Sequence, residues 1–256
     1  MTTLTLLSRG TGSLLRSEAR LFLREGGALF FALAFPAVVL VGVGLVIPGM
    51  DEPLPAGPGA GLPTIALMLP PVLAAAMATP ALSTVPSTIA GYREQGVLTR
   101  LSTTPMRPVG LLLAQLVVGV ACFLAATVLA LVVGALVFTV PMPREVGVVI
   151  ASVVLGAVAM FALGMIIAAR ATKASTAQGI GMLVYFPMLF FAGMWTPGPV
   201  MPDAVATVAS WTPLGAISQA ISAGWLGGEV PWLQLAVTAG YAVLGIAVAA
   251  RLFRWS

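Results

Sequence analysis

Residues 109–140 have the sequence VGLLLAQLVVGVACFLAATVLALVVGALVFTV, a long apolar run that contains no charged residue. A transmembrane helix needs about 20 such residues to cross the hydrocarbon core of a bilayer. The run does not alternate between apolar and polar residues, as a membrane-spanning β-strand would. It therefore predicts a helix that crosses a membrane.

Five further runs of this kind occur in the chain, and composition supports the same interpretation. Apolar residues make up 59% of the 256 residues, and charged residues only 8%, against about 25% in soluble domains. A soluble enzyme of this size could not cover so much apolar surface. The sequence predicts an all-α polytopic membrane protein with six transmembrane helices in one domain (28–251), between a leading segment (1–27) and a tail (252–256). The other five runs are Ala28–Ile47, Thr64–Ala90, Val146–Ala169, Thr176–Trp195 and Pro231–Ala250.

Basic residues predict which side of the membrane each connection faces. All but one of them fall before the first run, after the last, or in the two connections that an even number of spans places on the same side. Arg144 is the one basic residue predicted on the other side, and the acidic residues Asp51, Glu52, Glu145 and others are predicted there too. Because cytoplasmic segments carry the excess of Lys and Arg, both termini are predicted to be cytoplasmic. The arginines then serve topology, and no nucleic-acid partner is expected.

Several kinds of chemistry are excluded by missing residue types. The chain has no His, one Cys and one Lys, so no catalytic residues and no metal site are predicted. Lys173 lies between Thr172 and Ala174, which does not fit the Gly-Lys-Ser/Thr of a phosphate-binding loop. None of the six runs contains an ionisable Asp, Glu, Lys, Arg or His, which argues against a proton-coupled antiporter and an intramembrane protease.

Polar side chains inside the runs have two possible roles. Hydrogen bonding between helices is the commoner one, especially next to prolines. Lining a path for a substrate is the other. The candidates for such a path are Thr79, Ser83, Ser87, Gln178 and Tyr185.

The segment from Tyr92 to Pro105 is too short and polar to cross a membrane. At 100° per residue, Val97, Leu98 and Leu101 share one face, so a short amphipathic helix across the base of the membrane domain is predicted. Glu94 falls on the apolar side of that helix. It could interact with the positive end of the helix dipole or pair with a partner protein.

Two other segments flank the runs. Arg16, Arg20 and Arg24 form a stripe opposite Leu14, Leu15 and Phe22, which favours an interfacial helix over a solvated basic leader. After the fifth run, a proline-broken, moderately apolar segment favours short helices that re-enter the outer leaflet over an ordinary loop.

Two sequence blocks carry a resemblance to a known family. The first is Tyr92-Arg93-Glu94-Gln95-Gly96-Val97-Leu98, continuing through Leu101, Thr104 and Pro105; the second extends from Phe191-Ala192-Gly193 to Trp211-Thr212-Pro213-Leu214. Together they resemble the permease subunit of an ATP-binding cassette exporter of the type-2 permease family, in its daunorubicin-resistance-like branch. The likeness covers residues 14–251, with departures at Val97 and Thr99.

The resemblance implies a division of labour between subunits. The 92–103 segment would be a coupling helix that docks on a dimer of a separate ATPase subunit, and ATP and Mg would be bound there. It implies that the N-terminal lead is a connecting helix and that Thr196–Pro213 holds the outer re-entrant helices. It also implies a second permease copy facing the second and fifth spans. The implied docking residues are Tyr92, Arg93, Glu94, Gln95, Gly96, Val97, Leu98, Arg100 and Leu101.

The expected function is ATP-driven export across a bacterial plasma membrane. A cavity without charges favours a hydrophobic or amphipathic small molecule, such as a drug or antibiotic, or a lipid. A passive channel or facilitator and a membrane scaffold without transport activity remain the alternatives. The chain itself is expected to bind no cofactor.

Overall fold

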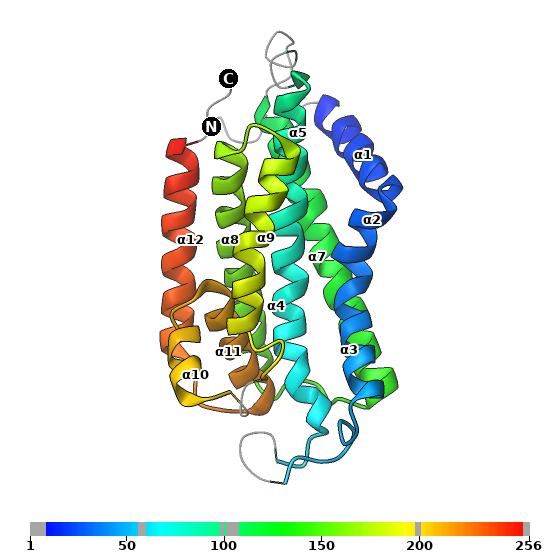
Figure 1. The fold of residues 1–256 in the computed structure, drawn as a ribbon, viewed down its shortest axis with the longest axis vertical. Coiled ribbons are helices and arrows are strands. Elements are labelled where there is room, and N and C mark those ends of the chain that lie inside the picture. The colour runs from blue at the N-terminus through cyan, green and yellow to red at the C-terminus, as the bar shows by residue number, and fades with distance from the viewer. Residues whose placement is uncertain (1–8, 56–59, 98–99, 101–107, 198–200, 253–256) are drawn as a thin grey trace.

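The computed structural model describes residues 9–55, 60–97, 100, 108–197 and 201–252, and within them the regular structure is helical. The long helices run side by side along one direction and form a bundle (Figure 1). The start of α1 and the end of α12 lie at the same end of the bundle, close to the end of α5. The elements are α1 (Arg9–Arg24), α2 (Gly26–Leu29), η2 (Phe30–Ala34), α3 (Phe35–Val46), η3 (Thr64–Met68), α4 (Leu69–Thr79), η4 (Pro80–Thr84), α5 (Val85–Glu94), α7 (Pro108–Phe138), α8 (Val146–Arg170), α9 (Ala174–Phe191), α10 (Asp203–Ala209), α11 (Pro213–Leu226) and α12 (Trp232–Leu252).

Five helical stretches are long and apolar enough to cross a membrane, which confirms an all-α, multi-pass membrane protein. They match the second to sixth predicted runs: Thr64–Glu94, Gly110–Phe138, Val146–Arg170, Ala174–Phe191 and Trp232–Leu252. The first predicted run corresponds to α2, η2 and α3, which have 4, 5 and 12 residues and follow one another directly. At 1.5 Å per residue this run is about 30 Å long. Its apolar helix, Phe30–Val46, is shorter than the other five, so the count of six spans stays a prediction.

The fifth predicted span was placed too far along the chain. Its helix α9 ends at Phe191, four residues before the predicted end at Trp195. Gly193 adopts a left-handed conformation (φ 87°), and its N–H and that of Met194 donate to the carbonyls of Phe190 and Leu189. Such a glycine terminus closes a helix through bonds that an L-residue at positive φ would disfavour. Hydropathy alone does not report this stop.

The predicted outer helices are present, but with different bounds. The segment from Thr196 to Pro213 contains α10 and only the first residue of α11, which continues to Leu226. The Thr212 hydroxyl accepts the N–H of Gly215 and caps the start of α11, and Pro213 fits the first turn because it needs no N–H partner there. Most of α11 is buried against α4, α8 and α12, at the end of the bundle opposite the start of α1 (Figure 1).

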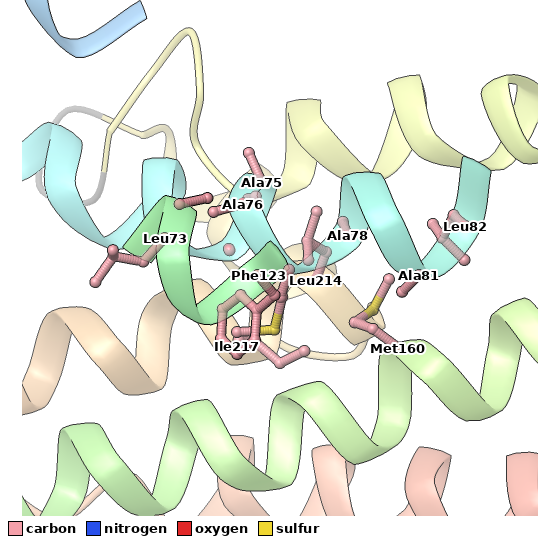
Figure 2. Packing of buried hydrophobic residues seen from close by; sticks show 14 of the residues in the cluster. Leu73, Ala75, Ala76, Ala78, Ala81, Leu82, Phe123, Met160, Leu214 and Ile217 are labelled. Carbon is pink, nitrogen blue, oxygen red and sulfur yellow. The ribbon is translucent and has the colours of Figure 1, made fainter. Parts of the chain in front are cut away.

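The centre of the bundle is the helical path formed by η3, α4, η4 and α5. Its most apolar part is completely buried, with α7, α8, α9 and α11 packed around it. Alanines on α4 and η4 allow these neighbours to approach closely, as small residues do in membrane bundles. Figure 2 shows this core, in which Phe123 of α7, Met160 of α8 and Ile217 of α11 pack against the central helix.

Wide helical turns interrupt two of the helical paths, and each lies next to prolines. The π-helical turn η4 starts at Pro80 and is followed by Pro86. The π-helical turn η2 precedes Pro36. A proline has no N–H for the carbonyl four residues earlier, so Pro86 leaves the Leu82 carbonyl without its usual helical donor. Local widening of the helix is one way to relieve such a conflict.

Two glycines on neighbouring helices lie directly against the η4 turn. A Cβ atom at Gly164 of α8 would overlap the carbonyl oxygen of Ala81, and one at Gly181 of α9 would overlap that of Leu82. The absence of a side chain at both positions therefore allows α8 and α9 to contact the central backbone. In contrast, a Cβ atom at Gly179 would meet nothing within 4 Å.

The N-terminal helix shows the amphipathic pattern that the sequence predicts. Arg16, Arg20 and Arg24 are exposed, whereas Leu15 and Phe22 are half-buried. Helix α1 packs against α7 and is followed by α2 after a break at Glu25 (Figure 1). Nothing is described for the side chain of Leu14 or for residues 1–8.

We expect Gly164→Ala and Gly181→Ala each to destabilise the purified protein by about 1–3 kcal/mol, the usual effect of overpacking. The added methyl group would collide with backbone, which cannot move aside as a flexible side chain can. Thermal unfolding in detergent measures the effect. Gly179→Ala, on the exposed side of the same helix α9, is the control because a Cβ atom there meets nothing within 4 Å. Equal melting temperatures for all three variants would contradict the packing argument.

Candidate functional site

The predicted coupling segment consists of the end of one helix, a tight turn and the start of another. Tyr92, Arg93 and Glu94 are the last residues of α5, so they continue the second span. Gly96 then adopts a left-handed conformation (φ 66°). The helix resumes after it, because the N–H of Arg100 donates to the Gly96 carbonyl at 3.1 Å.

The prediction of one continuous helix from Tyr92 to Thr103 is therefore wrong at its start. The positive φ of Gly96 stops α5, and only residues beyond it can belong to a separate helix. Within the described part, Gln95 and Arg100 are exposed, and Gly96 and Val97 are half-buried. Leu98 and Leu101, two predicted docking residues, lie outside the described residues.

Arg93 and Glu94 both bind the turn between α8 and α9. Arg93 Nη1 donates to the carbonyl of Ala168 (2.8 Å), in the last turn of α8, and to that of Ala171 (2.6 Å), directly after the helix. Glu94 Oε2 accepts the N–H of Ala174 at 3.1 Å, at the start of α9. A cation at a helix C-terminus and an anion at a helix N-terminus are both favourable. These two side chains thus fasten the second span to the α8–α9 turn.

Tyr92 contacts a buried carboxylate that sequence reasoning missed. Its hydroxyl donates to Glu18 Oε2 of α1 at 2.6 Å, and Gln115 Nε2 of α7 donates to the same oxygen. Glu18 is only 6% exposed. One signal was available: Glu18 lies between Leu15 and Phe22 at helical spacing, on the half-buried face of α1.

All five residues proposed for a substrate path line one groove. The groove lies between α2–α3, η4–α5 and α9 and has a volume of about 650 Å³. Thr79 Oγ1 and Tyr185 Oη lie 2.9 Å apart and form a hydrogen bond between helices. These two side chains therefore bond one helix to another and also line the groove. The five predicted path residues that line the groove are Thr79, Ser83, Ser87, Gln178 and Tyr185.

The expectation of a cavity without charges is wrong. Glu25, just before α2, lines this groove. A second cavity of about 610 Å³ adjoins it towards the coupling segment and is lined by Glu18, Tyr92, Gln95 and Gln115 among others. The two cavities share the lining residues Glu25, Ser87, Thr88 and Gln178. The six apolar runs contain no charge, but Glu18 of α1 and Glu25 just after it bring carboxylates to the end of the groove nearest the coupling segment.

The family of the chain follows from comparison with known proteins. Residues 9–225 match the model of the family described as "ABC-2 type transporter". This chain belongs to that family. The resemblance inferred from the coupling segment and the outer helices is thereby confirmed. The described helices agree with this family, since several of them are long and apolar enough to cross a membrane.

A curated relative agrees with this assignment. The chain is 30% identical over 95 residues to a Bacillus subtilis (strain 168) protein named "Putative transport permease YvfS". The matched region is 36% of this chain and 37% of that relative. This ABC-2 chain therefore shares only about a third of the relative's length.

We expect Arg93→Ala to loosen the α8–α9 turn of this ABC-2 chain. Each hydrogen bond from a charged group contributes about 1.5–3 kcal/mol, so local opening of the turn should become at least roughly tenfold more frequent. Hydrogen–deuterium exchange at residues 171–177 measures this. Arg170→Ala is the control, since Arg170 is exposed in the last turn of α8. Identical exchange in both variants would show that Arg93 does not hold the turn.

Proposed function

We propose that this chain is the membrane subunit of an ATP-driven exporter of hydrophobic or amphipathic small molecules or lipids. The observation that carries the proposal is a single helical path, Thr64–Glu94, that connects the groove with the coupling segment. Thr79 and Ser83 line the groove near the middle of that path, and Glu94 ends it at the coupling turn. A displacement at one end would therefore reach the other along one unbroken helical path.

The energy for transport would come from a partner. The sequence contains no phosphate-binding loop, and its apolar runs contain no ionisable relay. We therefore assign ATP and Mg to a dimer of separate ATPase subunits. ATP binding would close that dimer against the coupling segment and shift the equilibrium between an inward-open and an outward-open packing of the helices.

A second copy of the permease would complete the transport path. Phe31 and Phe186, which line the groove, are more than half exposed. Large exposed aromatic side chains on such a face suit either lipid or a protein neighbour. We propose that the mouth of the groove, between η2–α3 and α9 with the second span at its base, faces a second permease copy, so that two grooves enclose one passage.

The proposed orientation places both termini in the cytoplasm of a bacterium. The exposed arginines of α1, the end of α5 and the end of α8 lie at one end of the bundle, and α10 and α11 lie at the opposite end (Figure 1). Under the positive-inside rule, the first end is cytoplasmic. Cargo would then enter at the inner cavity and leave near α10 and α11.

Reconstitution of the chain with and without its cognate ATPase tests the proposal. We expect proteoliposomes to accumulate a fluorescent hydrophobic cargo against a gradient only when the ATPase and MgATP are both present. Equilibration of cargo by the chain alone would instead indicate a passive facilitator. A stable complex with ATPase but no flux would indicate a scaffold. Uphill transport driven by a pH or sodium gradient alone would also overturn the proposal.

We expect Arg100→Glu to reduce ATP-driven export several-fold without changing membrane insertion or thermal stability. Arg100 is exposed beyond the coupling turn, where its Nη2 donates to the Gln95 carbonyl at 2.9 Å. Because this bond is exposed to water, a reversed charge there would disturb a docked ATPase more than the fold. Glu94 is a less clean choice because it also caps α9. Arg251→Glu, on an exposed residue in the last turn of α12, is the control. Full export by the Arg100 variant would count against docking at this segment.

A further inference from the structure

The two π-helical turns in the described part of the chain both form part of the wall of the groove. Phe31 lies in η2, and Ser83 and Thr84 lie in η4; all three residues line the groove. Helix α9, which forms the third wall, is α-helical throughout. Such wide turns are rare and occur frequently at functional sites. Their shared position therefore connects an unusual backbone with the groove.

Both turns have the same spacing to a proline. Five π-helical residues and one further residue precede Pro36 after η2 and Pro86 after η4. Because proline has no N–H, the carbonyls of Ala32 and Leu82, four residues earlier, lack their α-helical donor. A wider register offers each of these carbonyls the N–H of the residue after the proline instead. The two registers therefore differ by few hydrogen bonds.

A proline by itself does not impose the wide turn. Pro187 lies inside α9, which remains α-helical from Ala174 to Phe191. The turns at η2 and η4 thus depend on their surroundings as well as on their prolines. Backbone of this kind has two arrangements of similar energy, and the contacts around it decide which one is populated.

Side-chain hydrogen bonds hold the η4 turn on both sides. Before it, Thr79 Oγ1 lies 2.9 Å from Tyr185 Oη of α9. After it, the hydroxyls of Ser87 and Thr88 both donate to the Thr84 carbonyl at 2.9 Å. Hydroxyl donors of this kind satisfy carbonyls where a membrane helix is irregular. Tyr185 thus ties the central path to α9 directly before the turn.

The neighbouring helices contact η4 through glycines rather than through interlocking side chains. A Cβ atom at Gly164 of α8 would overlap the Ala81 carbonyl, and one at Gly181 of α9 would overlap the Leu82 carbonyl. Small sliding movements between packed helices are a common form of conformational change in proteins. The smooth backbone surfaces on α8 and α9 therefore leave η4 free to change its register in place.

We propose that η2 and η4 are paired hinges that set the width of the groove. Conversion of η4 between its wide turn and a regular α-helical turn moves Ser83 and Thr84 relative to α9, and η2 does the same for Phe31. A change of one residue in register rotates the chain beyond it by about 100° and shifts it by about 1.5 Å, so even part of this movement changes the groove. The hinges belong to the chain itself, and only their use in transport rests on the proposed function.

Spin labels on opposite sides of the groove test the proposal. Phe31→Cys and Phe186→Cys place them on two groove-lining residues that are more than half exposed, and Cys122→Ala removes the native thiol. Double electron–electron resonance is recorded on the full chain in lipid nanodiscs, with labelled chain diluted into excess unlabelled chain. We expect the unmodified hinges to give a broad distribution of distances, because two groove widths are populated.

Proline variants then shift this distribution. Pro86→Ala restores the missing N–H and favours the regular turn, so we expect the distribution to narrow at least about twofold. Pro36→Ala should act in the same direction through η2. Pro70→Ala is the control, since Pro70 lies in the first turn of α4 in the same helical path, where an N–H partner is not needed.

A variant with the opposite effect separates a hinge from a general loss of packing. Tyr185→Phe keeps the ring but removes the bond to Thr79, so the path is tied less firmly to α9 and the distribution should broaden. Equal widths in the unmodified chain, the Pro86 variant and the Tyr185 variant would overturn the proposal. A change in the Pro70 variant as large as that in the Pro86 variant would do the same.

The same labels distinguish the hinges from the proposed function. Proline-dependent groove widths that the cognate ATPase and MgATP leave unchanged would support the hinges and refute the ATP-driven exporter. ATP-driven export by a chain whose groove keeps one fixed width would leave the exporter standing and refute the hinges.

Discussion

The contact between the central helical path and the backbones of its neighbours supports the rest of the bundle. The prolines around η4 disturb the regular helical bonding of this path, and its turn widens. Gly164 and Gly181 then meet the carbonyls of Ala81 and Leu82 at distances that no side chain would permit. Because lipid supplies no hydrophobic drive for helices to associate, such close packing is what holds a membrane bundle together.

The same path ends in one helical turn whose three side chains bond α1, the end of α8 and the start of α9. Tyr92 bonds Glu18 of α1, which also holds Gln115 of α7. Arg93 bonds the end of α8, and Glu94 bonds the start of α9. A force applied next to this turn would thus reach the leading helix and the α8–α9 turn together. This arrangement explains how a short segment at the end of α5 could move several helices together.

Polarity changes along the groove in a way that suits a bilayer. Hydroxyl, amide and aromatic groups line its middle, whereas carboxylates appear only at the inner end. A charge near the membrane surface costs less than one at its centre. The carboxylates therefore come from the leading helix and the residue after it, and the spans remain free of charge. A ligand could thus reach these carboxylates although the membrane-spanning helices carry no charge in the middle of the bilayer.

The amino-acid sequence alone determined the membrane-spanning runs, because hydropathy is a local property that sums along a segment. It also located the polar residues of the groove and the coupling segment, in which α5 ends. The end of α9 at Gly193 follows from a local glycine turn that hydropathy does not report, whereas the roles of Arg93, Glu94 and Glu18 were decided by tertiary structure. Their hydrogen-bond partners lie 74 to 97 residues away. No local pattern encodes such pairings, since they exist only after α1, α5, α7, α8 and α9 have packed together.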